Sequence, residues 1–296
     1  MINYINQRIH SIPLKKGAFN FCGNDISNDI NVSYEFNFFE TYIDNDMEHF
    51  NYLNPGDSEK DRYSDIKSYN HNIVTINQGK GYINASPINI FMNRYFISTQ
   101  GPKEETINDF WTMVWEHKCN VIVMLCNEKE GGRLKCAKYW DENKVKQFYR
   151  IKIEEEPKNN YIVRKIKLFN NSEKKERTVY QIHFNGWPDH GVPDVKDGKV
   201  FDSFIEIIEL VDKIRGNEPI VVHCSAGVGR TGTFISMYYL EKEIKRQIQD
   251  KVEIIQFNIF NLVRKLKEMR LYLVQTKSQY RFIYEFVRYL LLKYNV

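Results

Sequence analysis

The segment Val221–Phe234, VVHCSAGVGRTGTF, decides the fold and carries the strongest candidate functional site. It begins inside the run PIVVHC at 219–224, which is apolar on both faces, as a buried central strand is. Helical spacing resumes at Phe234, so the residues between form a strand-to-helix turn. At such a turn the first helical N–H groups have no partner and the helix dipole is positive, which favours a bound anion.

Cys224 and Arg230 stand at the two ends of this turn. Gly227 and Gly229 let the backbone bend, so that successive N–H groups point into one concavity. Arg230 adds a planar fork that can hold two oxygens of a phosphate. The same groups favour the thiolate of Cys224 at neutral pH, which predicts a nucleophile facing a bound phosphate. A structural cysteine at a tight turn is the alternative interpretation.

Composition bounds the kind of protein. The 296 residues are 42% hydrophobic, which is enough for a packed core. A net charge of +4 is too small to indicate nucleic acid. The five cysteines lack the spacing of a disulfide framework or a metal site. The longest apolar run, at 121–126, is too short to span a bilayer. We therefore expect a cytoplasmic protein without nucleic-acid or membrane partners.

Local patterns predict an α/β fold. Apolar runs predict strands at 73–76, 95–99, 121–125, 149–153, 161–169, 178–184 and 219–224. Helical spacing predicts helices around 36–50, from Phe201 to a stop at Gly216, and over 234–246, 255–269 and 280–294. Loops are expected at 54–62, 170–177 and 186–199. We expect a single domain with a twisted, mixed sheet flanked by helices over residues 56–296, and an N-terminal helical and loop extension, 1–55, packed on it.

At HCSAGVGRTG the chain resembles the tyrosine-specific protein tyrosine phosphatases, whose signature is H-C-S-A-G-x-G-R-[ST]-G. Further stretches match the family in order: KDRY at 60–63, YINAS at 82–86, TQGP at 99–102, FWTMVWE at 110–116, LKCAKYW at 134–140, GWPDHGVP at 186–193 and QTKSQYRF at 275–282. The resemblance implies a cysteine-based phosphatase fold with a highly twisted mixed sheet. It also implies no metal or other cofactor, and phosphotyrosine-containing proteins as partners.

The resemblance implies a role for each catalytic residue. Cys224 would be the nucleophile that forms a cysteinyl-phosphate intermediate. Asp189 would be the general acid and then the general base, on a mobile loop supported by Trp187. Thr231 would favour departure of the sulfur, and Gln275 would orient the hydrolytic water. An Asp in an ordinary turn is the alternative for Asp189.

The resemblance also implies the residues that bind the substrate. The phosphoryl group would be held by Arg230 and by the loop residues Ser225, Ala226, Gly227, Val228 and Gly229. Tyr63 would stack on the phosphotyrosine ring, and Asp65 would accept N–H groups of the substrate backbone. The alternative for Tyr63 is a core position.

The supporting residues Glu130 and His223 and the substrate-binding residues Lys135, Gln275 and Gln279 complete the expected site. Glu130 would support the catalytic Arg230, and Lys135 would approach the general acid; a solvated surface pair is the alternative for these two. His223 would help to hold the thiolate, unless it is a buried packing histidine. Gln279 would border the site with Gln275, and exposed glutamines at a helix start are the alternative for both.

Four positions, Asp61, Gly81, Lys267 and Tyr272, depart from the family pattern. Asp61 replaces an Asn and adds charge near the substrate loop, and Gly81 replaces an acid. Lys267 and Arg270 fall at two family Arg positions, so we expect a weaker secondary basic rim. Tyr272 replaces a small residue, and we expect it to narrow access for residues that flank phosphotyrosine.

Two other functions compete with the phosphatase interpretation. A phosphotyrosine-binding domain with little turnover would lack the Cys, Asp or Arg that this chain keeps. A broader cysteine phosphatase would have a shallow pocket without a KDRY-type loop. The chain also resembles virus-encoded phosphatases, including those of wasp polydnaviruses, which act in the cytoplasm of a host cell.

Overall fold

The computed structural model of the chain describes residues 29–45, 51–89, 95–145, 149–188, 191–196, 198–253 and 255–296. Two parts of the expected N-terminal extension, 1–28 and 46–50, lie outside the described residues. The candidate general acid Asp189 lies outside them as well. No helix in the described part of the chain is long and apolar enough to cross a membrane.

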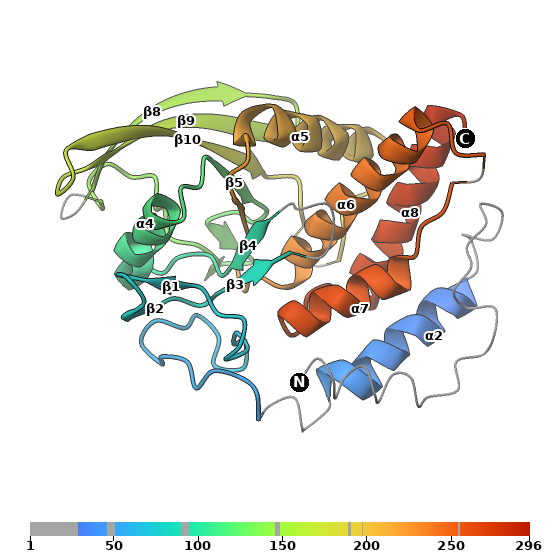
Figure 1. Cartoon of the computed structure of the whole chain (residues 1–296), viewed down its shortest axis with the longest axis horizontal. Coiled ribbons are helices and arrows are strands. Elements are labelled where there is room, and N and C mark those ends of the chain that lie inside the picture. Colours follow the sequence, from blue (N-terminus) through green and yellow to red (C-terminus); the bar gives the residue numbers. More distant parts are fainter. Residues whose placement is uncertain are drawn as a thin grey trace.

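A seven-stranded sheet forms the centre of the molecule (Figure 1). In sheet order its strands are β3 (Ala85–Ile88), β4 (Phe96–Thr99), β11 (Ile220–His223), β5 (Val121–Met124), β10 (Lys175–Phe184), β9 (Tyr161–Asn170) and β8 (Tyr149–Pro157). The middle strands β4, β11, β5 and β10 run parallel, and β3, β9 and β8 pair antiparallel. The predicted mixed α/β sheet is therefore confirmed.

Burial follows the position of each strand in the sheet. Every residue of β5 and β11 is buried, because central parallel strands are covered on both faces. Residues of β9, nearer the edge, largely alternate between buried and half-buried. Two short ribbons lie outside this sheet: β1 (Thr75–Ile76) with β2 (Gly81–Tyr82), and β6 (Lys129–Glu130) with β7 (Arg133–Leu134).

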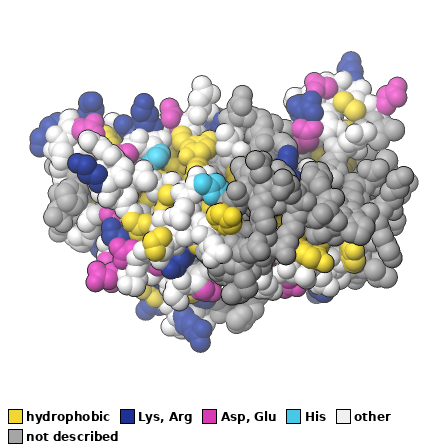
Figure 2. Space-filling model, turned by 60° about the horizontal axis from the view of Figure 1, so that its bottom comes forward, with side chains coloured by type: hydrophobic (Ala, Val, Ile, Leu, Met, Phe, Trp, Pro, Cys, Tyr) yellow, Lys and Arg dark blue, Asp and Glu magenta, His cyan; other side chains and the backbone are white. Residues whose placement is uncertain are grey.

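Helices flank the central strands. They are α2 (Asp29–Phe39), α4 (Ile107–Glu116), α5 (Lys199–Arg215), α6 (Gly229–Gln249), α7 (Ile259–Met269) and α8 (Lys277–Tyr294), with a short π-helix η1 (Glu40–Asp44) and a 3₁₀ turn η2 (Glu104–Thr106). Figure 1 shows α6, α7 and α8 together on one side of the central strands and α4 on the other. Figure 2 shows basic and acidic side chains interspersed on the described part of the underside, as a net charge of +4 suggests.

Several predicted boundaries were wrong, each for a local reason. The strand β3 was missed because Pro87 interrupts its apolar pattern, although an edge strand tolerates proline. The helix expected from 255 begins at Ile259, because the Asn258 side chain accepts the Asn261 N–H at 2.7 Å and caps it. The loop expected at 170–177 is a tight hairpin between β9 and β10.

Within the N-terminal extension, α2 and η1 pack on α7 and α8. The Phe39 ring stacks on Phe260 with 4.8 Å between centroids. Glu35 is buried, and its Oε2 accepts hydrogen bonds from the hydroxyls of Tyr280 at 2.6 Å and Tyr284 at 2.5 Å. Burial raises the pKa of Glu35, although both phenol hydrogen bonds oppose the shift.

Candidate active site

The loop of residues 224–228 joins the end of β11 to the start of α6, at the carboxyl edge of the parallel strands. Segments that follow β4, β5 and β10 reach the same edge, because parallel strands end together. The strand-to-helix turn predicted from the sequence is therefore present. Its residues lie at the positive end of the α6 dipole.

Five consecutive carbonyl groups of this loop are bonded to the surrounding scaffold. The Cys224 oxygen accepts from His223 Nδ1 at 3.1 Å, and the Ser225 oxygen accepts from the Gly101 N–H at 2.9 Å. Arg270 donates to the oxygens of Ala226 and Gly227 at 3.3 and 3.1 Å.

The remaining contacts complete this pattern. Ser98 Oγ donates to the Gly227 oxygen at 2.8 Å, and the Val228 oxygen accepts from the N–H groups of Gly232 at 2.8 Å and Val274 at 3.2 Å. By contrast, the loop N–H groups of Ser225, Ala226, Val228 and Gly229 donate to no residue that the structure describes. A backbone with its carbonyls turned outward and its N–H groups unpaired is a receptor for an anion.

Gly227 is required by this geometry. Its φ is +72°, in the left-handed region, and a Cβ there would lie 2.1 Å from the Thr99 carbonyl oxygen. Gly101 is equally constrained, since a Cβ at that position would lie 2.7 Å from the Cys224 carbonyl oxygen. Both glycines allow β4 and its following segment to pack directly against the loop.

The Cys224 side chain lies at the base of the loop and is 5% exposed. Its Sγ accepts the Gly227 N–H at 3.3 Å. At least one backbone donor thus points at the sulfur.

His223 holds the backbone of the cysteine rather than its sulfur. The residue is fully buried, and burial lowers the pKa of His223 to about 3, so its imidazole is neutral. With Nδ1 donating to the Cys224 carbonyl, Nε2 accepts from the Tyr139 hydroxyl at 2.9 Å. The Gln181 amide donates to that hydroxyl at 2.6 Å. Sequence reasoning missed Tyr139 and Gln181, although LKCAKYW contains the tyrosine.

Arg230 is fixed across the pocket by a bidentate ion pair. Its two terminal nitrogens lie 2.6 and 2.8 Å from the two carboxylate oxygens of Glu130. The same nitrogens donate to the carbonyls of Leu125 at 3.1 Å and Pro188 at 3.0 Å. Burial alone would lower the pKa of Arg230, but the Glu130 hydrogen bonds and the charge of Cys224 outweigh it, so the pKa is raised.

These groups line one pocket of about 370 Å³. It brings together eleven of the predicted site residues: Tyr63, Asp65, Glu130, Lys135, Cys224, Ser225, Ala226, Gly229, Arg230, Gln275 and Gln279. Ile66, Gly191, Thr276 and Ser278 also line it and were not foreseen. Of the other predicted residues, His223, Val228 and Thr231 are fully buried.

Tyr63 is attached to the loop it faces. Its hydroxyl donates to Ser225 Oγ at 2.9 Å, and that oxygen in turn donates to the Lys135 carbonyl at 3.0 Å. Arg62, which sequence reasoning missed, ties this segment to the region after β4 by donating to the Gly101 and Pro102 carbonyls at 3.0 and 2.7 Å. The Tyr63 ring is therefore held at a fixed distance from the loop of residues 224–228.

Asp61 does not add charge at the pocket. It is buried, and its Oδ1 accepts from the Tyr82 hydroxyl at 2.6 Å and the Asn84 amide at 2.9 Å. Oδ2 accepts the Asp57 N–H at 3.1 Å. The carboxylate thus braces the loop that carries Tyr63.

Lys267 and Arg270, where we expected a weaker secondary basic rim, form no rim, because both side chains are fully buried. Lys267 Nζ lies 2.7 Å from Asp44 Oδ2 in η1. Arg270 finds its partners inside the protein: besides the loop carbonyls, it donates to Asn84 Oδ1 at 2.6 Å and to Ser68 Oγ at 2.9 Å. Tyr272 is half-buried and is not among the described residues that line the pocket.

The glutamines and Thr231 occupy different environments. Gln279 Oε1 accepts the N–H groups of Gln275 at 3.0 Å and Thr276 at 3.2 Å, so it caps α8 while its side chain lies beside Gly229. The Gln275 side chain is exposed at the pocket rim. The Thr231 hydroxyl is buried without a hydrogen-bond partner among the described residues.

The segment that precedes Asp189 is held at the pocket. Trp187 is 2% exposed and packs against Phe184, Phe204 and Phe282. Its indole N–H donates to the Gly191 carbonyl at 3.2 Å. The described flanks of Asp189 thus lie at the pocket, and Pro188 is bonded to Arg230.

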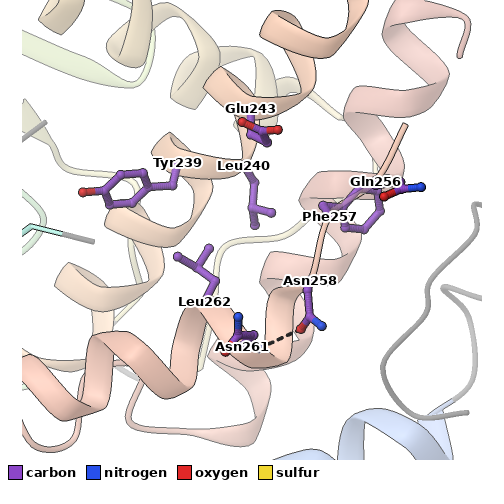
Figure 3. Close-up of a pocket in the computed structure, with 8 residues that line it drawn as sticks. All are labelled: Tyr239, Leu240, Glu243, Gln256, Phe257, Asn258, Asn261 and Leu262. Carbon is purple, nitrogen blue, oxygen red and sulfur yellow. Dashed lines mark hydrogen bonds between the residues drawn. The ribbon is translucent and has the colours of Figure 1, made fainter. Parts of the chain in front are cut away.

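A second pocket of about 370 Å³ lies between α6 and α7 (Figure 3). The side chains of Leu240 and Leu262 point toward each other across it. Glu243 supplies the only carboxylate among its described lining residues, and this group already accepts from Arg246 and Gln247, each at 2.7 Å. No cationic side chain is among those lining residues, so none of them supplies a positive charge to a bound phosphate.

Comparison with known proteins shows the family of the chain. A family model described as protein-tyrosine phosphatase matches residues 57–289. Human tyrosine-protein phosphatase non-receptor type 20 is 39% identical over 241 residues, which cover 79% of this chain and 54% of that protein. Human receptor-type tyrosine-protein phosphatase alpha is 38% identical over 79% of this chain and 29% of its own length.

A solved structure, described as the structural basis of PTPN18 fingerprint on distinct HER2 tyrosine phosphorylation sites, superposes with a TM-score of 0.76. It is 30% identical, and the match covers 88% of this chain and 95% of that one. The chain spans about half the length of the non-receptor type 20 proteins that it matches.

Proposed function

Because the chain belongs to the protein-tyrosine phosphatase family, we propose that it removes phosphate from phosphotyrosine in proteins through a cysteinyl-phosphate intermediate. One observation carries this proposal. The loop after β11 has its carbonyls bonded outward, and Cys224 and Arg230 converge on the single pocket that it lines. That pocket presents a nucleophile and a receptor for an oxyanion at the same point.

In the first step the Cys224 thiolate attacks phosphorus, and the bond from phosphorus to the tyrosine oxygen breaks. The loop N–H groups and Arg230 receive the three remaining phosphoryl oxygens, where negative charge accumulates. Glu130 keeps the guanidinium in its plane through two short hydrogen bonds. The departing phenolate needs a proton, and we assign its supply to Asp189.

In the second step water attacks the cysteinyl-phosphate and the sulfur leaves as a thiolate. Asp189 now accepts a proton from that water, and Gln275 at the rim orients it. The Thr231 hydroxyl, buried and without a partner among the described residues, is available to donate to the departing sulfur. Apart from substrate and water, each group assigned a role in the two steps is a side chain or backbone N–H of this chain.

Selectivity for tyrosine is assigned to Tyr63. Its ring forms a wall of the pocket, and its hydroxyl is bonded to Ser225 in the loop. A flat aromatic substrate can stack there and reach the sulfur, whereas a short phosphoserine side chain cannot. Asp65, exposed on the same rim, is placed to accept N–H groups of the substrate backbone. We place this activity in the cytoplasm, and action inside a host cell as a viral protein stays a prediction.

The test is phosphate release from matched phosphotyrosine and phosphoserine peptides. We expect turnover of the phosphotyrosine peptide only, and none with Cys224→Ser. Tight binding without turnover by the unaltered chain would instead identify a phosphotyrosine-binding domain. Equal rates on both peptides would identify a broader cysteine phosphatase.

A further inference from the structure

The strand β8 forms one edge of the seven-stranded sheet and pairs with β9 alone among the described residues (Figure 1). The Lys158 N–H donates to the Tyr161 carbonyl at 2.8 Å, so these two residues form a hydrogen-bonded pair at the hairpin end. Hydrogen-bonded and non-hydrogen-bonded pairs alternate along an antiparallel ladder. Residues 152, 154 and 156 therefore direct their backbone groups to β9.

The other residues of β8 direct their backbone groups outward. Ile151, Ile153 and Glu155 present N–H and C=O groups at the open edge. Two observations agree with this assignment of inward and outward backbone groups. The Tyr149 N–H donates to the Val145 carbonyl at 3.2 Å instead of to β9, and Pro157, which has no N–H, falls at an outward position.

The side chains of this edge are arranged unevenly. Lys152 and Glu154 are exposed on the same face of the sheet. Glu154 lies opposite Lys165 of β9, with 3.7 Å between the charged atoms. Lys152 lies opposite Lys167, and like charges directly opposite each other destabilise a sheet. Lys152 therefore has a repulsive neighbour within its own sheet and an open edge on its other side.

We propose that β8 pairs antiparallel with β8 of a second copy of this chain, with a twofold axis at Ile153. In this pairing, a residue that precedes Ile153 by a given number of positions lies opposite the partner's residue that follows Ile153 by the same number. Lys152 then faces Glu154 of the partner, and this pair occurs twice. Ile153 pairs with Ile153 of the partner, and Ile151 with Glu155 of the partner, each through the outward backbone groups. The two sheets become one.

The order of charges along β8 indicates that the partner strand is β8 of a second copy. Lys152 precedes Ile153 and Glu154 follows it, so an antiparallel copy of β8 places a carboxylate opposite each lysine. The catalytic pocket lies at the end of β11, and β5, β10 and β9 separate that strand from β8. Activity is therefore expected to be the same in the single and paired chain, and it serves with circular dichroism as a check of folding. Exposed charges on an edge can also simply prevent aggregation, and that alternative predicts a monomer.

The test is sedimentation and light scattering of the full chain over a wide range of concentration. We expect a reversible dimer that high salt weakens. Lys152→Glu and Glu154→Lys each replace two attractive pairs by two repulsive ones, and should raise Kd by roughly tenfold or more. An equimolar mixture of the two variants should form a heterodimer as tight as the unaltered homodimer, because each acidic position of one then faces a basic position of the other.

Two further variants separate pairing from folding. Ile153→Pro removes an outward N–H that makes no bond to β9, so the fold should persist and the dimer should be lost. Lys175→Glu, an equal charge change at an exposed position of β10, should leave the dimer unaltered. A monomer at every concentration would overturn the proposal. A dimer Kd that is the same in Lys152→Glu, Glu154→Lys and the unaltered chain would also overturn it. So would a failure of the two variants to associate when mixed.

Discussion

Two pockets of equal size, about 370 Å³ each, use the same helix and differ in chemistry. The pocket proposed as catalytic meets α6 at its first residues, Gly229 and Arg230. The second meets α6 on its side, at Tyr239, Leu240 and Glu243 (Figure 3). The start of a helix offers unpaired N–H groups and a positive dipole, whereas its side offers only side chains, because its backbone groups are already bonded. The place on the helix, rather than the volume, decides what a pocket can bind.

The largest expected effect is that of Cys224→Ser. It should lower kcat for a phosphotyrosine peptide by roughly 10³-fold or more, because a serine hydroxyl is a far weaker nucleophile than a thiolate. Binding of the peptide should persist, since the loop donors remain. Kinetics with titration calorimetry would check both. If kcat of Cys224→Ser stayed within tenfold of the unaltered value, Cys224 would not be the nucleophile that distinguishes this pocket from the second one.

The next effect is that of Arg230→Lys. A lysine keeps the charge but loses the fork that meets Glu130 and the phosphate together, so kcat/KM should fall by roughly 10²-fold or more. Steady-state kinetics would measure it. Arg246→Lys is the matched control beside the second pocket, and it should leave kcat/KM within twofold. A similar fall of kcat/KM in both variants would mean that the Arg230 guanidinium affects activity only through the stability of the fold.

Acid should weaken the scaffold behind the catalytic loop. Burial lowers the pKa of His223 to about 3, and burial with the nearby Arg164 lowers the pKa of His183 to about 4. Both values lie below the ordinary value of 6.5, so the unfolded chain takes up protons first as the pH falls. Their contribution to stability is complete above about pH 6.5. It is lost as the pH falls toward about 4 for His183 and about 3 for His223.

Thermal unfolding at pH 7.5, 6, 5 and 4.5 would measure this loss as a falling Tm. The fall should be shallower in His183→Asn, which lacks one of the two titrating groups. A Tm that stays constant down to pH 4.5 would contradict the assigned neutral state of both imidazoles.

The smallest effect on catalysis is expected from Leu240→Ala in the second pocket. Removing a buried leucine should cost about 2–5 kcal/mol of stability, because it leaves a cavity. The value of kcat/KM at a temperature well below Tm should remain within twofold. Denaturant unfolding and steady-state kinetics would report the two quantities separately. A loss of kcat/KM greater than tenfold in the folded variant would mean that the two pockets are coupled through α6.

The sequence was informative where one segment determines its own structure. β11, α5 and the turn at 224–228 follow from apolar runs, helical spacing and glycines that lie next to one another in the chain. Gly216, at the predicted end of α5, has a φ of +63° and allows the chain to turn there. The family resemblance added the pocket residues, which the fold brings together from four separate segments.

The sequence was less informative where a residue depends on distant partners. Arg270 was expected in a secondary basic rim because it falls at a family Arg position. Its burial depends on Ser68, Ser86 and Asn84, roughly two hundred positions away. Lys267 likewise depends on Asp44. The neutral state of His223 follows from its burial, which depends on the packing of distant segments.

The outward bonding of the loop carbonyls has a consequence for inhibition. Ser98, Gly101 and Arg270 bind the loop carbonyls on the side away from the pocket. The shape of the loop therefore does not depend on whether a bound phosphate carries a tyrosine. A preorganised receptor spends little ordering entropy on any tetrahedral oxyanion that fits it. Free orthophosphate, the end product, should therefore compete with substrate, raising apparent KM while leaving kcat unchanged. Progress curves run with added phosphate would reveal an enzyme that slows itself as its product accumulates.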